Sequence, residues 1–231
     1  MMSKLISELK GLKSVLLFAP FTYYLLVILS ILMADEPKTI FYYNEMIMLP
    51  LIVMMAGLLF QREFSGSMME IYATFPVSLI AMLLRKVLFL VVIIFTLHLG
   101  WTFIYLAKFD MMETTVFAYS GAKPAFKSTS ILHLFFQAFP GYLFISSIVA
   151  SGLIFSKQLY GGWLLGFAVW MFFSLMGNEW NGPFSLYTIY IREDTAFWLN
   201  QLLLLLFACG LTIISAIQLN KRTRWIVLEE E

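Results

Sequence analysis

The residue types that most often do chemistry are scarce in this chain of 231 residues. It has two histidines, His98 and His133, and one cysteine, Cys209, and each lies within a long apolar run. A metal site or a catalytic centre needs several such side chains together, and the sequence offers none of the three a suitable partner nearby. We therefore expect polar contacts between helices for the two histidines, and we interpret Cys209 as a small apolar residue.

Motifs that would mark an enzyme or a nucleotide-binding protein are also missing. The sequence contains no G-x-x-x-x-G-K-[ST] phosphate loop, no G-x-S-x-G nucleophile elbow and no H-E-x-x-H zinc pair. We expect that the chain is not itself an enzyme and that it binds no metal or cofactor of its own.

Glu45 is the one carboxylate inside an apolar run, about one helical turn from the end of that run. Charged groups are costly in hydrocarbon, and those that occur there are commonly functional. We expect Glu45 to reach the headgroups or to bond a neighbouring helix, with an ion site as the alternative. A proton- or sodium-driven transporter would carry acidic residues near the middle of the membrane, so their lack argues against self-powered transport.

Composition and the length of the apolar runs predict an all-α integral membrane protein. Apolar residues make up 61% of the chain and charged residues 13%, against roughly 45–50% and 25% in soluble domains. About 20 apolar residues cross the ~30 Å hydrocarbon core as a helix. Gly162 and Gly166, four residues apart, would let one such helix approach a neighbour closely. Six transmembrane helices are predicted in a single transmembrane domain, 1–231, at residues 15–33, 43–60, 79–107, 131–155, 159–176 and 196–219.

The distribution of basic residues predicts how the chain crosses the cell membrane. With six spans, ten of the 15 Lys and Arg residues lie on the side that holds both termini, and an excess of positive charge marks the cytoplasmic side. Residues 1–14 place their leucines on one helical face, which predicts an interfacial helix, with a frayed tail as the alternative. Residues 177–195 mix aromatic and polar side chains, which predicts an outer-leaflet helical loop.

The loop between the second and third predicted spans carries the run R-E-F-S-G-S-M-M-E-I-Y-A-T-F-P-V-S. Ser67 and Glu70 have the spacing of a capping box, in which each side chain satisfies the backbone donor of the other. Pro76 disfavours helical geometry in the residue before it. The run therefore predicts a short helix from about Met68 to Phe75, on the inner membrane face and tied to both spans.

This run, followed by R-K at the next span, resembles the type-2 permease family of ATP-binding-cassette transporters. In that family an acidic residue, a Gly-Ser/Thr pair, a further Glu, a Pro-Val-Ser and a Lys recur between the second and third of six spans. The spacing from the Gly to the second Glu and to the Pro is one residue longer here than in the commonest form. The matching residues are Glu63, Gly66, Ser67, Glu70, Pro76, Val77, Ser78 and Lys86.

The resemblance implies that the chain is the membrane-spanning subunit of an exporter. Its loop helix would be a cytoplasmic coupling helix that docks on a separate ATPase, which binds ATP and Mg, and a second permease subunit, identical or a sister chain, would complete the transporter. The cargo would be hydrophobic or amphipathic: a peptide, a drug or a lipid-linked molecule. The implied ATPase contacts are Glu63, Phe64, Gly66, Ser67, Met69, Glu70 and Pro76.

Two other function classes stay open at this point. A scaffold or sensor subunit that transports nothing would need no particular residues. An intramembrane enzyme would need polar groups, with His98 and Glu45 the candidates, to converge on one cavity.

Overall fold

The computed structural model describes residues 15–37, 40–64, 68–116, 125–181, 184–188, 191 and 196–226. The interfacial helix predicted at residues 1–14 lies outside these. Within them the chain forms seven α-helices and one short hairpin, so the predicted helical class is confirmed. The elements are η1 (Val15–Leu17), α2 (Phe18–Met33), the π-helical turn η2 (Tyr42–Ile47), α3 (Met48–Phe64), α4 (Met68–Thr74), α5 (Leu79–Phe109), β1 (Glu113–Val116), β2 (Ala125–Ser128), α6 (Ile131–Ser156), α7 (Leu159–Asn181), α8 (Phe197–Asn220) and the 3-10 helix η4 (Arg222–Trp225).

Five helical segments in the described part of the chain are long and apolar enough to cross a membrane, which is consistent with a multi-pass membrane protein. The exception among the six predicted spans is the first. Helix α2 has 16 residues, which gives it a length of about 24 Å at 1.5 Å per residue, shorter than the ~30 Å hydrocarbon core. The five segments are Tyr42–Gln61, Leu79–Phe109, Ile131–Ser156, Leu159–Met176 and Phe197–Asn220.

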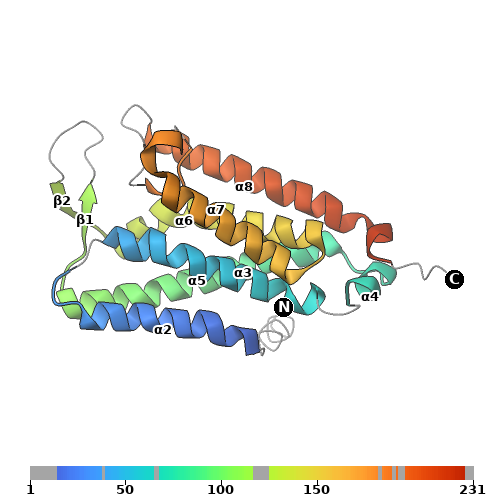
Figure 1. Cartoon of the computed structure of the whole chain (residues 1–231), viewed down its shortest axis with the longest axis horizontal. Helices are drawn as coiled ribbons and strands as arrows, with labels where there is room; N and C mark the ends of the chain where they lie inside the picture. The colour runs from blue at the N-terminus through green and yellow to red at the C-terminus, as the bar shows by residue number, and fades with distance from the viewer. Residues whose placement is uncertain are drawn as a thin grey trace.

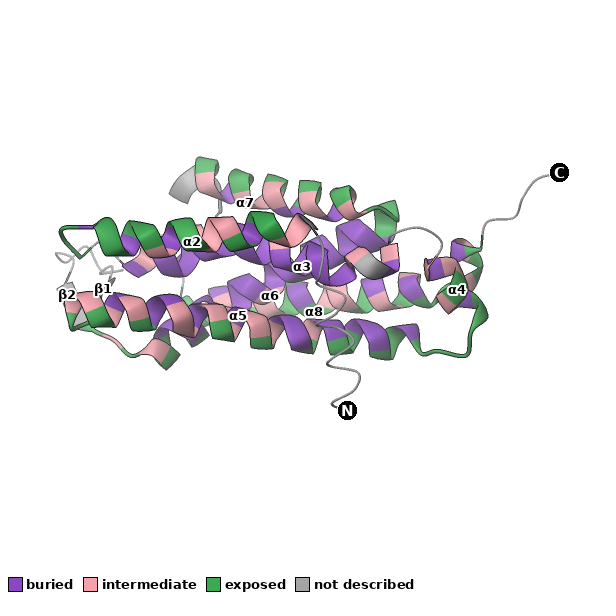
Figure 2. Cartoon of the chain, turned by 90° about the horizontal axis from the view of Figure 1, so that it is seen from below, coloured by how far each residue is buried: buried purple, intermediate pink, exposed green. Residues whose placement is uncertain are grey.

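The long helices run side by side, with α3 and α6 innermost (Figure 1). The segments differ in how far the most apolar 18-residue stretch of each is buried. In this stretch 83% of the residues are buried in the α3 segment and 78% in α6, against 17–39% in α5, α7 and α8. Figure 2 shows the exposed residues on the outward faces of α2, α5 and α7. Many of these are large apolar side chains, such as Leu88 and Leu175. An outer surface of this kind is stable in lipid rather than in water.

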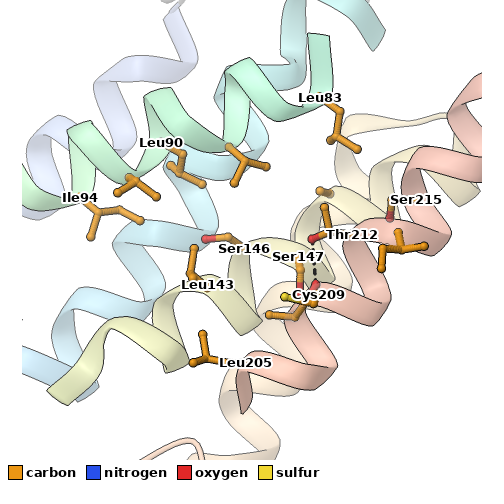
Figure 3. Close-up of a pocket in the computed structure, with 15 residues that line it drawn as sticks. Leu83, Leu90, Ile94, Leu143, Ser146, Ser147, Leu205, Cys209, Thr212 and Ser215 are labelled. Atoms are coloured by element: carbon orange, nitrogen blue, oxygen red, sulfur yellow. Dashed lines mark hydrogen bonds between the residues drawn. The ribbon is translucent and has the colours of Figure 1, made fainter. Parts of the chain in front are cut away.

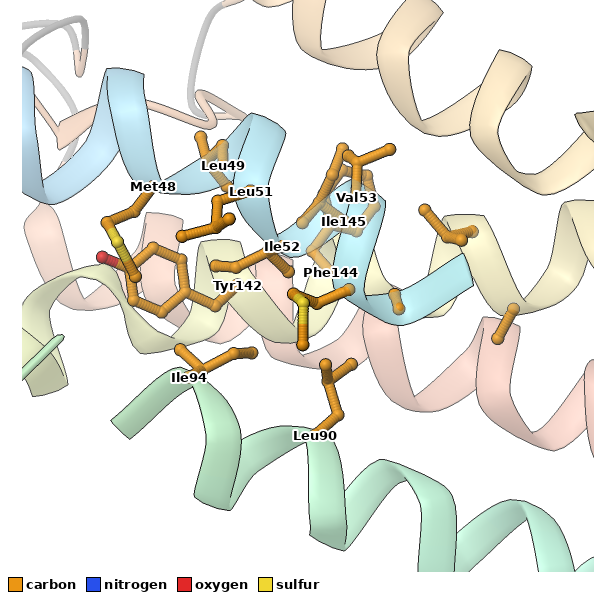
Figure 4. Close-up of a cluster of buried hydrophobic side chains, with 14 of the residues drawn as sticks. Met48, Leu49, Leu51, Ile52, Val53, Leu90, Ile94, Tyr142, Phe144 and Ile145 are labelled. Atoms are coloured by element: carbon orange, nitrogen blue, oxygen red, sulfur yellow. The ribbon is translucent and has the colours of Figure 1, made fainter. Parts of the chain in front are cut away.

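The core forms where α3 packs on α6, with α5 along one side. Met48, Ile52 and Ile145 are fully buried in this contact (Figure 4). Its polar groups are bonded across the helices: the Tyr142 hydroxyl donates to the backbone carbonyl of Asn44, and the Asn44 amide donates to the carbonyl of Leu134 at 3.0 Å. These bonds attach the η2 turn to α6 and satisfy groups that water cannot reach in a membrane.

Helices α6 and α7 approach closely where the glycine spacing predicts it. A Cβ atom placed on Gly162 would lie 2.7 Å from the carbonyl oxygen of Val149 and 2.6 Å from the Leu153 side chain. One placed on Gly166 would lie 2.5 Å from the Val149 side chain. These separations are shorter than van der Waals contact, so only glycine fits at this crossing.

A two-stranded hairpin at the opposite end from α4 was not predicted (Figure 1). Strand β1 pairs with β2 in antiparallel register, with Glu113 opposite Ser128 and Val116 opposite Ala125. It lies in the connection between α5 and α6, between the third and fourth predicted spans.

Replacing Gly162 by Ala tests the close crossing of α6 and α7. We expect a loss of about 1–3 kcal/mol in stability, because the added methyl group overpacks a fixed backbone contact. The measurement is the temperature at which the detergent-solubilised protein loses its monodisperse size-exclusion peak. Gly210→Ala in α8 is the control, since a Cβ there meets no atom within 4 Å. Equal melting temperatures for the two variants would contradict the packing argument.

Candidate functional site at the α4 end

The short helix α4 lies at the end of the molecule where α3 ends, α5 begins and the C-terminal η4 returns (Figures 1 and 2). It spans Met68–Thr74, where the sequence predicts a helix. The chain then turns at Pro76 and enters α5 at Ser78, whose side-chain oxygen accepts a hydrogen bond from the backbone N–H of Ala81 at 3.2 Å. This N-cap fixes where α5 begins, immediately after α4.

Arg222 of η4 binds the end of α4 and the turn that follows it. Its guanidinium donates to the carbonyl oxygens of Ala73 at 3.1 Å, Phe75 at 2.5 Å and Val77 at 2.7 Å. The last carbonyls of a helix have no partners inside the helix, and a cation is favoured at that end of the helix dipole. One side chain from the C-terminal segment therefore holds α4 and the start of α5 together.

The rest of the C-terminal segment reaches two further helices. Trp225 is buried and packs edge-on against Phe64 at the end of α3, with ring centroids 5.6 Å apart. The Arg224 side chain donates to the carbonyl of Phe155 in α6 at 2.6 Å, and Lys157 donates to the carbonyl of Arg224 at 2.5 Å. The α4 end is thus a junction between α3, α4, α5, α6 and η4.

A buried ion pair joins α3 to α5 beside this junction. The Lys86 ammonium lies 2.8 Å from the Glu63 carboxylate, and it also donates to the carbonyl of Leu59 and lies over the Phe60 ring. Lys86 is only 1% exposed. Buried charges are tolerated when they are paired and hydrogen-bonded, as this lysine is.

Two of the residues predicted to touch a partner are buried within this chain. Glu63 is buried against Lys86, and Met69 lies on the buried side of α4. Phe64 is half-buried against Trp225, and Glu70 is also half-buried. Of the expected contacts that the structure describes, only Pro76 is exposed. Within this chain the Glu63 carboxylate is paired with Lys86, and its contact with a partner stays a prediction.

Helix α4 and the turn that follows it nevertheless present an apolar surface, which we call the α4 patch. It consists of Ile71, Phe75 and Val77, of which Phe75 is 58% exposed. Met69 and Ala73 of this helix are buried, whereas Ile71 is exposed. Exposed apolar groups that lie together on a rigid element mark interaction sites. Gly66 and Ser67, the remaining predicted contacts, lie outside the described residues.

Comparison of the chain with protein families, with curated proteins and with solved structures gives no match. What the α4 end can do therefore follows from its own geometry. It combines an exposed apolar patch with firm attachment to the ends of the long helices.

Glu45 bonds a segment of the chain far away in the sequence. Its carboxylate accepts hydrogen bonds from the backbone N–H of Thr188 at 2.7 Å and from the Thr188 hydroxyl at 2.5 Å, while Gln137 donates to that hydroxyl at 2.9 Å. The sequence predicted headgroup contact or a bond to a neighbouring helix, with an ion site as the alternative; the observed partner is the segment between α7 and α8. The predicted outer loop is buried here, at Ser185 and Tyr187; residues 182–183, 189–190 and 192–195 of it lie outside the described part.

The two polar residues that could have formed a catalytic centre, His98 and Glu45, bond different partners. His98 is buried, its Nε2 donates to the carbonyl of Ile131 at 3.2 Å, and its ring packs against Trp101 and Phe135. The cavity between α5, α6 and α8 is lined by neither His98 nor Glu45. No group of three His, Cys, Asp or Glu residues that could hold a metal ion occurs among the residues whose structure is described.

Replacing Lys86 by Met tests the buried ion pair. We expect a loss of about 3–5 kcal/mol, because the Glu63 carboxylate keeps its buried position without its cation. In the double variant Glu63→Gln/Lys86→Met the charge is removed as well, so most of the stability should return. Melting of the four proteins in detergent gives the coupling between the two residues. Additive effects of the two substitutions would show that the pair contributes nothing.

Proposed function

We propose that this chain is the membrane-spanning subunit of an ATP-driven exporter of the ATP-binding-cassette type, with the ATPase on a separate polypeptide. The observation that supports this most directly is the combination found at the α4 end. The α4 patch is free to bind a partner, and the backbone behind it is bonded by Arg222. A partner that moves α4 would therefore move the helices attached to it, rather than a loose loop.

The charge distribution supports a cytoplasmic α4 end. Nine of the described residues are Lys or Arg; Lys108 and Lys127 lie toward the hairpin end, and the other seven lie at the α4 end. Short loops on the cytoplasmic side carry such an excess. A soluble cytoplasmic ATPase could then reach the α4 patch. In this proposal η1 and α2 together form the first span, which brings the number of spans to six. The exposed apolar face of α2, with Phe21 and Leu25, lies against lipid.

The coupling would proceed through rigid contacts. ATP and Mg bind to the partner, and closure of two ATPases under two permease subunits displaces the α4 patch. The Arg222 bonds pass that displacement to η4 and the start of α5, and the Glu63–Lys86 pair links α5 to α3. The long helices would then shift between inward- and outward-open arrangements, which admit a hydrophobic or amphipathic cargo on one side and release it on the other.

Changing Phe75 to Asp tests the partner site. We expect at least tenfold lower recovery of the co-expressed ATPase with the tagged chain, since loss of a central aromatic contact in an interface commonly costs about 2 kcal/mol or more. Met111→Asp is a matched control: its side chain is equally exposed, at 58%, but it follows α5 at the hairpin end. The measurement is the ratio of the two proteins after purification in mild detergent.

Equal recovery of the ATPase with both variants would place the contact elsewhere. If no phosphate-loop protein accompanies even the wild-type chain when its neighbouring genes are co-expressed, a scaffold or sensor role would replace the proposal.

Changing Arg222 to Gln separates binding of the ATPase from coupling to it. The α4 patch keeps its side chains, so we expect the ATPase to be recovered in normal amount. The bonds that hold α4 to η4 are lost, so ATP hydrolysis in reconstituted vesicles should fall to the rate of the ATPase without permease. Hydrolysis at the wild-type rate would show that force passes through another contact.

A further inference from the structure

A cleft of about 300 Å³ lies between α5 and α8, with α6 as its floor (Figure 3). One wall runs along α5 from Leu83 to Ile94, and the other runs along α8 from Leu205 to Ser215. The lining passes from buried residues on the floor, such as Ala150, to exposed residues on the rim of α8. The cleft therefore opens sideways, toward the surroundings of the helices.

The cleft has no polar group that calls for a polar ligand. None of the described residues that line it is charged. Its hydroxyl groups are already bonded within the protein: Ser146 donates to the carbonyl of Tyr142 at 2.6 Å, and Thr212 donates to that of Ala208 at 2.8 Å. A ligand with hydrogen-bonding groups would lose its bonds to water here without replacement, so the ligand that fits is a hydrocarbon.

The length and position of the cleft match one leaflet of a bilayer. From Leu83 to Ile94 is 11 residues, or about 16 Å along the helix axis at 1.5 Å per residue. Half of a ~30 Å hydrocarbon core is about 15 Å. Leu83 is near the start of α5 and Ile94 near its middle. The cleft therefore runs parallel to the helices within the half of the protein that contains α4.

The volume distinguishes a lipid chain from a helix of another protein. A helix about 10 Å wide would need roughly 1,200 Å³ over a length of ~16 Å. A single extended hydrocarbon chain, with carbon contacts of about 4 Å, needs only roughly 250–300 Å³ over the same length. The cleft, at about 300 Å³, is far smaller than a helix would need and has room for one extended chain.

We propose that this cleft is a binding site for one acyl chain of a membrane lipid, taken from the leaflet at the α4 end. The site depends on the location of the helices in a bilayer and not on the partner ATPase. Its test can therefore be made on this chain alone, and the result is independent of the co-purification experiment.

The experiment uses the wild-type chain in phosphatidylcholine vesicles in which one acyl chain carries a photoactivatable diazirine near its middle. After irradiation, the adducts are mapped by peptide mass spectrometry. We expect adducts on the floor of the cleft, at Ser147 and Ala150, as well as on the outward-facing Leu84 and Leu88. Adducts confined to the outward-facing residues would overturn the proposal, and this comparison needs no variant.

A pair of α8 variants provides the matched control. Ala208→Phe places a ring in the cleft, so the floor adducts should be lost while those on Leu84 remain. Gly210→Phe adds the same ring where a Cβ meets no atom within 4 Å, so the floor adducts should persist. Floor adducts that persist in a folded Ala208→Phe protein would overturn the assignment.

The native cysteine tests the competing occupant, a second copy of the chain. Cys209 is the only cysteine, and it lies exposed on the rim of the cleft. We expect oxidation in vesicles to leave the chain as a monomer on non-reducing gels. A covalent dimer through Cys209 would place another copy over the cleft and overturn the lipid site.

Discussion

Inside hydrocarbon there is no water to bond a polar group, so each such group has to find a partner within the protein. Lys86 illustrates the constraint most fully, because its ammonium meets the Glu63 carboxylate, the Leu59 carbonyl and the Phe60 ring at once. The serine hydroxyls along α6 find partners differently, by donating to carbonyls of their own helix, as Ser146 does. With these polar groups bonded, the bundle can turn apolar side chains outward to lipid.

The same constraint shapes the two ends of the bundle. At the hairpin end, the Glu45 carboxylate accepts both donors of Thr188 and so anchors the segment between α7 and α8. At the α4 end, the carbonyls left without partners by a seven-residue helix and its turn are taken up by Arg222. Bonds between residues far apart in the sequence thus connect helix ends that would otherwise be free, and the proposed coupling depends on those at the α4 end.

Features governed by nearby residues could be predicted from the sequence, and features governed by distant partners could not. The position of α4 follows from Pro76 and the residues just before it, and the close crossing of α6 and α7 follows from the glycine spacing. The inward position of Glu63 depends on Lys86, and the role of Arg222 on carbonyls about 150 residues away. A lysine about two turns inside a predicted span was a signal that a carboxylate partner must lie close to it.

The α5–α8 cleft lies between two helices that the α4 end also connects. Helix α5 begins at the turn whose carbonyls accept from Arg222, and η4, which carries Arg222, follows α8 directly. A displacement of α4 would therefore act on the end of each cleft wall, while the floor on α6 is packed against α3 and α7. In a fully interdigitated helix interface, a change in the distance between the helices forces packed side chains out of their preferred rotamers, which costs free energy. A cleft filled by a mobile lipid chain can change its width at a lower cost in free energy, because the lipid chain adjusts instead. Under the proposed function, the acyl chain would occupy the cleft between α5 and α8, the two helices that move relative to one another.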